Sequence, residues 1–149
     1  MQARMKNPAM IVTDAMGPLT ALGKMLSNSP IAEKTRELVH LRTSQINGCA
    51  VCIDGALTRT TETPQRLAAV AVWHEAPFFS DAERAALALA ESMTRLADQR
   101  DPVPDAVWAE AARHYNEPEL AWLVIDVAIM NLYNRINVTT KQVAGQQRW

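Results

Sequence analysis

The sequence predicts an all-α, single-domain protein, and three observations carry this prediction. Apolar residues recur at helical spacing along most of the chain, only five glycines occur among 149 residues, and alternating Val/Ile/Thr runs bounded by turn residues are missing. A chain of this length buries roughly two-thirds of the surface that its unfolded form exposes, enough for one core. We therefore expect residues 1–149 to form a single bundle of about six to seven helices.

Four helices are predicted in the first half of the chain. The first covers about Asp14 to Leu26, and the second about Ala32 to Ile46, both with apolar residues on one side. Asn47-Gly48 ends the second helix, because glycine adopts a positive φ without strain. A third helix then runs from Cys49 to about Thr60, and Thr63-Pro64 starts a fourth.

The fifth and sixth helices have clear start signals. Ser80-Asp81-Ala82-Glu83 is a capping box, in which the serine accepts a hydrogen bond from a first-turn amide and the glutamate reaches back. The helix that it opens is expected to end near Leu96. Pro102-Val103-Pro104 then breaks the chain, and we expect Trp108 and Ala112 to face the core from a sixth helix.

The last helix, which starts near Asn116, has an unusual composition. Between Leu120 and Leu132 only Asp126 and Asn131 interrupt an apolar run. Apolar residues then cover nearly the whole circumference, so this helix must be buried on several sides. It is therefore either central to the bundle or in contact with another subunit.

Composition and charge exclude several classes of protein. Fifteen basic residues balance sixteen acidic ones and are scattered, which does not favour a nucleic-acid partner. Two cysteines are too few for the disulfide framework of a small secreted protein. No apolar stretch has the length of a signal peptide or a membrane span. We expect a cytoplasmic protein with no membrane partner, no cofactor and no bound metal.

The segment QINGCAVCIDGA contains both cysteines, Cys49 and Cys52. At a helix start their sulfurs lie near unpaired amides and the positive end of the helix dipole, which favours the thiolate. We prefer a redox pair, which the small neighbouring residues leave accessible. Two other interpretations stay open: two buried cysteines that pack as small apolar side chains, or a zinc site that requires His40, His74 or His114 to converge.

Glu37 is a further candidate for chemistry. It lies beside Leu38 and Leu41, close to the side of its helix that should face the core. An unpaired carboxylate in a core is costly unless it is hydrogen-bonded or protonated, so Glu37 is a candidate proton shuttle. The alternative is a solvated glutamate paired with Lys34 or Arg36.

Several separated motifs occur in a characteristic order. They are Glu37-Leu38-Val39, Leu41-Arg42, Ser44 to Cys49, Cys52-Ile53-Asp54, Trp73 to Pro77, Glu83 to Leu87, and Asn134-Arg135-Ile136. Together these motifs resemble the alkyl hydroperoxidase D-like, carboxymuconolactone decarboxylase family, over about Ala15 to Val138. The resemblance implies an all-α fold, homo-oligomers (dimers, trimers or hexamers), and thiol chemistry in which Cys49 and Cys52 reduce a peroxide or exchange electrons with a thiol partner. It also implies that Glu37 is a proton-relay carboxylate.

The sequence departs from this family at one important position. The family pattern is Cys-x-x-Cys-x-x-x-His, and its histidine deprotonates the reactive cysteine and protonates the leaving alcohol; here that position is Ala56. The segment between Cys52 and Leu67 also appears about three residues shorter than in typical members. Loss of a general base typically lowers a rate by a factor of about a hundred to ten thousand.

We therefore predict a thiol-dependent peroxidase or disulfide oxidoreductase with impaired activity, and Cys49, Cys52 and Glu37 as its site. The helix dipole favours Cys49 as the nucleophile, whereas the family resemblance implies that Cys52 attacks and Cys49 resolves; we follow the family. One alternative is a carboxymuconolactone decarboxylase-like lyase, although that branch works without paired cysteines. The other is a non-catalytic oligomer.

Overall fold

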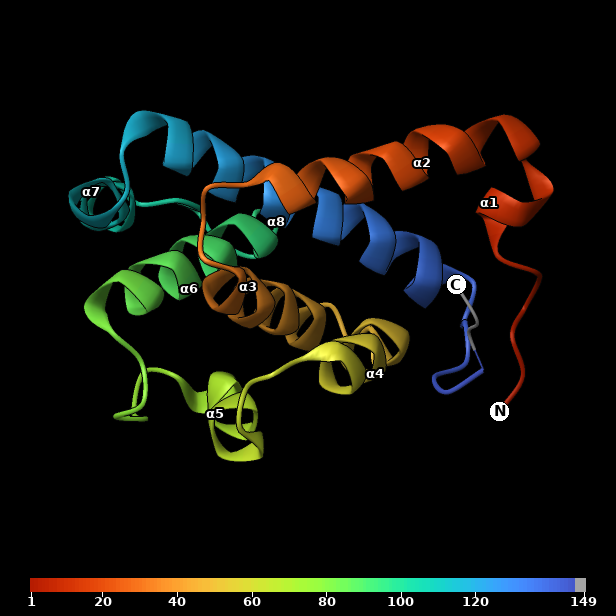
Figure 1. Ribbon diagram of the computed structural model, residues 1–149, viewed down its shortest axis with the longest axis horizontal. Coiled ribbons are helices and arrows are strands. Elements are labelled where there is room, and N and C mark those ends of the chain that lie inside the picture. Colours follow the sequence, from red (N-terminus) through yellow and green to blue (C-terminus); the bar gives the residue numbers. More distant parts are fainter. Residues whose placement is uncertain (147–149) are drawn as a thin grey trace.

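The computed structural model describes residues 1–146 and folds them into helices joined by short loops (Figure 1). The all-α prediction is confirmed. The described residues contain eight α-helices rather than six to seven, because the one-turn helix α1 was not expected. In chain order the elements are α1 (Pro8–Ile11), α2 (Thr13–Met25), the 3₁₀-helix η1 (Leu26–Asn28), α3 (Glu33–Ile46), α4 (Ala50–Arg59), α5 (Pro64–Ala69), the 3₁₀-helix η2 (Val70–Val72), α6 (Asp81–Thr94), α7 (Asp105–His114) and α8 (Glu117–Thr139).

Helix α3 is the centre of the bundle and packs against α6, α8 and α4 (Figure 1). Two groups of buried apolar side chains surround it. One joins α3 to α6, α7 and α8, and includes Val39, Leu89 and Leu123; the other joins α3 to α5, η2 and α6, and includes Leu38 and Leu87. Each fully buried Leu or Val side chain contributes about 1.5–3 kcal/mol of hydrophobic free energy.

The turn between α3 and α4 fixes the position of the cysteines. Gly48 has a φ of 67°, as expected from its place after a helix end. The Gly48 amide donates to the Gln45 carbonyl (3.2 Å) and the Cys49 amide donates to the Ser44 carbonyl (2.9 Å). These two bonds form a Schellman motif, which satisfies the last carbonyls of α3. Helix α4 can therefore begin at Ala50 without a linker.

Helix α7 presents a different face from the one expected. Trp108 is 44% exposed and Ala112 is also exposed, so the prediction that they face the core is wrong. Ala111 is fully buried instead, and Val107 packs against the same apolar group. Apolar residues occur on two sides of this alanine-rich helix, and contacts with α6 decide which side is inward.

Helix α8 begins with a capping box at Asn116. Its pattern of burial differs from the one expected from the apolar run. The two polar residues of its apolar run, Asp126 and Asn131, are buried, whereas Ile125 and Leu132 are 42% and 38% exposed. Within one chain α8 packs against α3, α6 and α4 but is not covered on every side, so its contact with another subunit stays a prediction.

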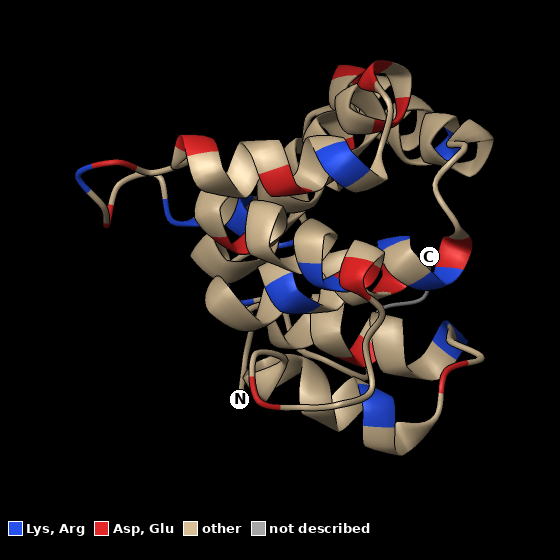
Figure 2. Ribbon diagram, turned by 90° about the vertical axis from the view of Figure 1, so that its left-hand side faces the viewer, with Lys and Arg blue, Asp and Glu red and all other residues tan. Residues whose placement is uncertain are grey.

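The N-terminal segment lies against the end of α8. The Arg4 amide donates to the Thr140 carbonyl (2.9 Å), and the Tyr133 hydroxyl donates to the Leu19 carbonyl (2.7 Å), which holds α2 next to α8. Basic and acidic residues are both scattered over the described helices (Figure 2). None of the helices in residues 1–146 is both long and apolar enough to cross a membrane.

Candidate functional site

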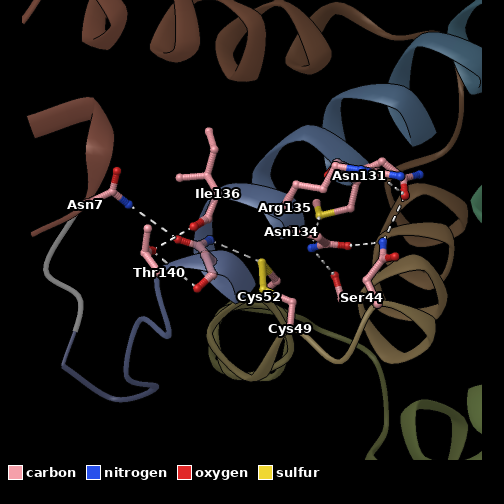
Figure 3. The surroundings of a disulfide bond; sticks show 12 residues. Asn7, Ser44, Cys49, Cys52, Asn131, Asn134, Arg135, Ile136 and Thr140 are labelled. Carbon is pink, nitrogen blue, oxygen red and sulfur yellow. Dashed lines mark hydrogen bonds between the residues drawn. A yellow bond between two sulfur atoms is a disulfide. The ribbon is translucent and has the colours of Figure 1, made fainter. Parts of the chain in front are cut away.

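Cys49 and Cys52 form a disulfide at the start of α4, with their Cα atoms 5.3 Å apart (Figure 3). Cys49 is the N-cap residue, and Cys52 lies in the first turn. The two cysteines differ in exposure: Cys49 is 1% exposed, whereas Cys52 is partly exposed. The first-turn amides of α4 have no carbonyl partner within the helix, so they and the helix dipole favour a thiolate here.

A cavity of about 480 Å³ borders the disulfide on the Cys52 side. Its walls come from α2, α4 and α8, and they include Leu19, Gly55, Tyr133 and Ile136 beside Cys52. Burial raises the pKa of the Tyr133 hydroxyl above its ordinary value and outweighs the opposite effect of a hydrogen bond with the backbone of Gly23. Tyr133 is therefore neutral at physiological pH, and it presents a mainly apolar ring to the cavity.

Asn137, on α8, is the polar group that contacts the disulfide. Its side-chain Nδ2 lies 3.5 Å from the Cys52 Sγ. Sequence reasoning missed this residue. A signal was present, because Asn131, Asn134 and Asn137 follow one another at intervals of three on an otherwise apolar helix, and such spacing places them on one side.

The other two asparagines of this row join α8 to the end of α3. The Asn47 Nδ2 donates to the Asn131 Oδ1 and to the Asn134 Oδ1, both at 2.9 Å. The Asn134 Nδ2 donates to the Ser44 Oγ at 3.1 Å (Figure 3). Because Ser44 and Asn47 belong to the turn that precedes Cys49, these bonds hold the disulfide at a fixed place relative to α8.

Glu37, the third predicted site residue, lies on α3 opposite the far end of α4. Its carboxylate accepts a hydrogen bond from the Thr60 hydroxyl (2.7 Å). The alternative partners considered for it are engaged elsewhere: Lys34 faces Glu62 at 3.7 Å, and Arg36 donates to a backbone carbonyl in η1. Glu37 is thus a partly buried, hydrogen-bonded carboxylate, and its role in proton transfer stays a prediction.

Ala56 lies on the inner side of α4. It is partly buried and packs against the apolar group around Leu38 and Leu41. The position at which the family motif has a histidine is therefore part of the packed interior between α3, α4 and α5, where an imidazole would require additional volume.

The histidines have partners away from the cysteines. His40 forms a hydrogen bond with the buried carboxylate of Asp126, and the ring of His74 stacks on Trp73 with centroids 3.6 Å apart. His114 lies 3.1 Å from Glu110. Within residues 1–146 no three His, Cys, Asp or Glu side chains gather in a way that could hold a metal ion.

The chain was compared with known families and proteins. It matches the carboxymuconolactone decarboxylase family over residues 14–92. It is 36% identical over 131 residues to the uncharacterized protein YdfG of Bacillus subtilis, a match that covers 86% of this chain and 88% of YdfG.

Two solved structures have a similar fold. A protein of unknown function from Agrobacterium tumefaciens, described as an AhpD antioxidant defence protein, gives a TM-score of 0.91 at 26% identity over 98% of this chain and 100% of that one. An uncharacterized peroxidase-related protein from Silicibacter gives a TM-score of 0.78 at 20% identity over 90% of this chain and 72% of that one.

These matches agree with the resemblance that the sequence motifs indicated. The family match covers the cysteine pair and the helices on both sides of it, and the fold similarity extends over nearly the whole chain. The chain belongs to the carboxymuconolactone decarboxylase family and has an AhpD-like fold.

Proposed function

We propose that this protein is a thiol-dependent oxidoreductase whose Cys49–Cys52 pair cycles between dithiol and disulfide, and that it reduces disulfides more readily than hydroperoxides. The observation that carries the proposal is the difference between the two cysteines. Cys52 borders the cavity of about 480 Å³, whereas Cys49 is buried behind it. This arrangement suits Cys52 as the attacking thiolate and Cys49 as the resolving thiol.

Disulfide exchange needs no proton donor at the site. The Cys52 thiolate attacks one sulfur of a substrate disulfide RS–SR, a Cys52–S–S–R bond forms, and RS⁻ leaves. Cys49 then loses its proton to solvent and attacks the Cys52 sulfur, which closes the protein disulfide and releases the second RS⁻. Thiols have a pKa of about 8.5, so a thiolate leaves without prior protonation. A dithiol reductant then reduces the Cys49–Cys52 disulfide by two further exchange steps and leaves as its own disulfide, which completes the cycle.

Hydroperoxide reduction, unlike disulfide exchange, needs a proton donor for the leaving group. The Cys52 thiolate attacks an oxygen of ROOH, Cys52–SOH forms, and RO⁻ must take up a proton to leave as ROH. Alkoxide and hydroxide are poor leaving groups, since their conjugate acids have pKa values near the value of about 15.7 for water. Ala56 cannot supply that proton, and His40 is hydrogen-bonded to Asp126 while the ring of His74 stacks on Trp73, both away from the cysteines. We expect slow peroxide turnover for this reason.

The experiment compares two oxidants under one reductant. Reduced protein is supplied with dithiothreitol and either oxidised glutathione or cumene hydroperoxide, and Cys52→Ser serves as the background. We expect catalysed reduction of the disulfide and hydroperoxide consumption close to that of Cys52→Ser. Hydroperoxide turnover that depends on Cys52 and exceeds disulfide turnover would contradict the proposed preference.

We also propose that the protein is a homo-oligomer. Helix α2 carries two charged residues, Asp14 and Lys24, and none of its residues is fully buried. On the opposite side of α8 from the core, Ile125 and Leu132 are exposed. Soluble monomers rarely expose apolar side chains along two helices in this way, and a second copy of the chain would cover the exposed faces of α2 and α8.

Light scattering coupled to size-exclusion chromatography tests this. We expect a single species at a multiple of the 16.5 kDa chain mass that persists at sub-micromolar concentration. The substitutions Ile125→Asp and Leu132→Asp should lower solubility rather than give stable monomers. A folded, monodisperse species at 16.5 kDa would contradict the proposal.

A further inference from the structure

Asn137 is the side chain on α8 that donates toward the reactive sulfur. It is 9% exposed, and its Nδ2 lies 3.5 Å from the Cys52 Sγ. An amide group has a donor end and an acceptor end, so its effect on a thiolate depends on which end faces the sulfur. The neighbouring hydrogen bonds decide this.

A backbone amide fixes the direction of the whole chain of hydrogen bonds. The Ala9 N–H can only donate, and it donates to the Asn7 Oδ1 at 3.0 Å. The other end of the Asn7 side chain, Nδ2, therefore points toward Asn137 and donates to its Oδ1 at 3.4 Å. This leaves the Asn137 NH₂ group directed at Cys52. Asn7 is itself held in place, since it is 6% exposed and caps α1.

We propose that Asn137 is a catalytic residue that stabilises the Cys52 thiolate by donating a hydrogen bond to it, and that Asn7 is a positioning residue that orients the Asn137 amide. This inference rests on the proposed thiol function and assigns a residue within it. An amide at neutral pH donates a hydrogen bond but does not transfer its proton. The pair Asn7–Asn137 thus activates the nucleophile without supplying an acid for the leaving group.

The inference also gives α1 a function. This one-turn helix holds the capping residue Asn7, and the N-terminal segment before it is tied to the end of α8 by the bond between Arg4 and Thr140. The N-terminal segment therefore reaches the reactive cysteine, which lies 45 residues further along the chain, through a single intervening side chain.

The test uses a single-thiol background. In Cys49→Ser the thiol of Cys52 is the one titrated, and its pKa is measured from the pH dependence of alkylation by iodoacetamide. Loss of a hydrogen bond to a charged group favours the protonated thiol, so Asn137→Ala should raise this pKa by about one to two units and slow alkylation at neutral pH by about tenfold or more. Asn137→Asp should raise it further, because a carboxylate would face the thiolate.

Two further variants separate this role from a structural one. Asn7→Asp keeps the oxygen that caps α1 but cannot donate to Asn137, so it should raise the Cys52 pKa while α1 stays capped. Asp126→Asn is the control, since Asp126 lies on the same helix, is buried, and bonds to His40 rather than to sulfur or to the turn before Cys49. It should lower the melting temperature and leave the Cys52 pKa unchanged.

The outcomes are distinct from those of the exchange assay. An unchanged Cys52 pKa in Asn137→Ala, or an equal rise in Asp126→Asn, would overturn the inference even if disulfide exchange is fast. If Asn137→Ala does not fold, Asn7→Asp decides alone, and an unchanged pKa there overturns the inference. The expected pKa shifts combined with no disulfide exchange would overturn the proposed function and leave the role of Asn137 intact.

Discussion

Cys52 and Ala56 lie one turn apart on the same face of α4, yet their surroundings differ. Cys52 borders a cavity and faces the amide of Asn137, whereas Ala56 packs into the apolar group around Leu38 and Leu41. The family motif implies a histidine at position 56, and hence a proton donor one turn from Cys52. This chain has instead a hydrogen-bond donor, the Asn137 amide, on α8. In the proposed function, thiolate stabilisation and proton delivery are therefore separate tasks, and Asn137 serves the first.

Replacement of either cysteine should have the largest effect on disulfide exchange, and the two replacements should have different effects. Cys52→Ser removes the sulfur at the cavity, and we expect loss of all disulfide exchange. Cys49→Ser should leave a reactive thiol that accumulates as a mixed disulfide, because the resolving step is missing. Intact mass after incubation with oxidised glutathione distinguishes the two variants. Equal glutathione adducts on both would remove the distinction between attacking and resolving thiols.

A histidine at position 56 should not restore the missing chemistry. The substitution Ala56→His inserts a large side chain beside Leu38 and Leu41, and overpacking of this kind costs about 1–3 kcal/mol of unfolding free energy. The shortened segment after Cys52 should also misplace the imidazole. We expect a lower denaturation midpoint in urea and no gain in cumene hydroperoxide turnover. Ala56→Val, which adds bulk without a base, is the matched control; a turnover gain in the histidine variant alone would show that the base was the sole deficiency.

A smaller effect is expected at the turn that places both cysteines. Gly48 has a φ of 67° and open space around the position of a Cβ atom, so Gly48→Ala tests backbone strain without a clash. We expect a loss of about 1 kcal/mol in unfolding free energy, measured by urea denaturation of the oxidised protein. Gly17→Ala is a suitable control, because it has equal space within α2 and an ordinary φ. Equal effects at both positions would mean that the positive φ does not matter.

The sequence predicted the parts of the fold that local chemistry determines. The caps at Thr63, Ser80 and Asn116 and the turn at Gly48 all occur as expected, because each depends on residues within a few positions. The prediction that Trp108 and Ala112 of α7 face the core was wrong, because tertiary contacts determine which of two apolar sides is buried. The one-turn helix α1 was missed, because its four residues are too few for a periodic pattern.

In the site, too, the sequence predicted the residues that lie close together in the chain and missed those that tertiary packing brings together. The Cys49–Cys52 pair was found because both residues lie within one turn of one helix. Asn137 lies 85 residues from Cys52, so its contact with the sulfur depends on how α8 packs against α4, which single-sequence patterns do not specify. The same holds for Asp126, whose burial beside His40 reverses the exposure that its charge suggests.

The redox equilibrium of the wild-type pair tests the central proposal most directly. Protein is equilibrated in glutathione buffers of graded redox potential, alkylated with iodoacetamide and weighed intact by mass spectrometry. We predict two species only, one with both cysteines alkylated and one that carries no label and has lost two hydrogens within the chain, with a single transition that dithiothreitol reverses. Two free thiols in every buffer, or disulfides that link chains instead of Cys49 to Cys52, would contradict the account.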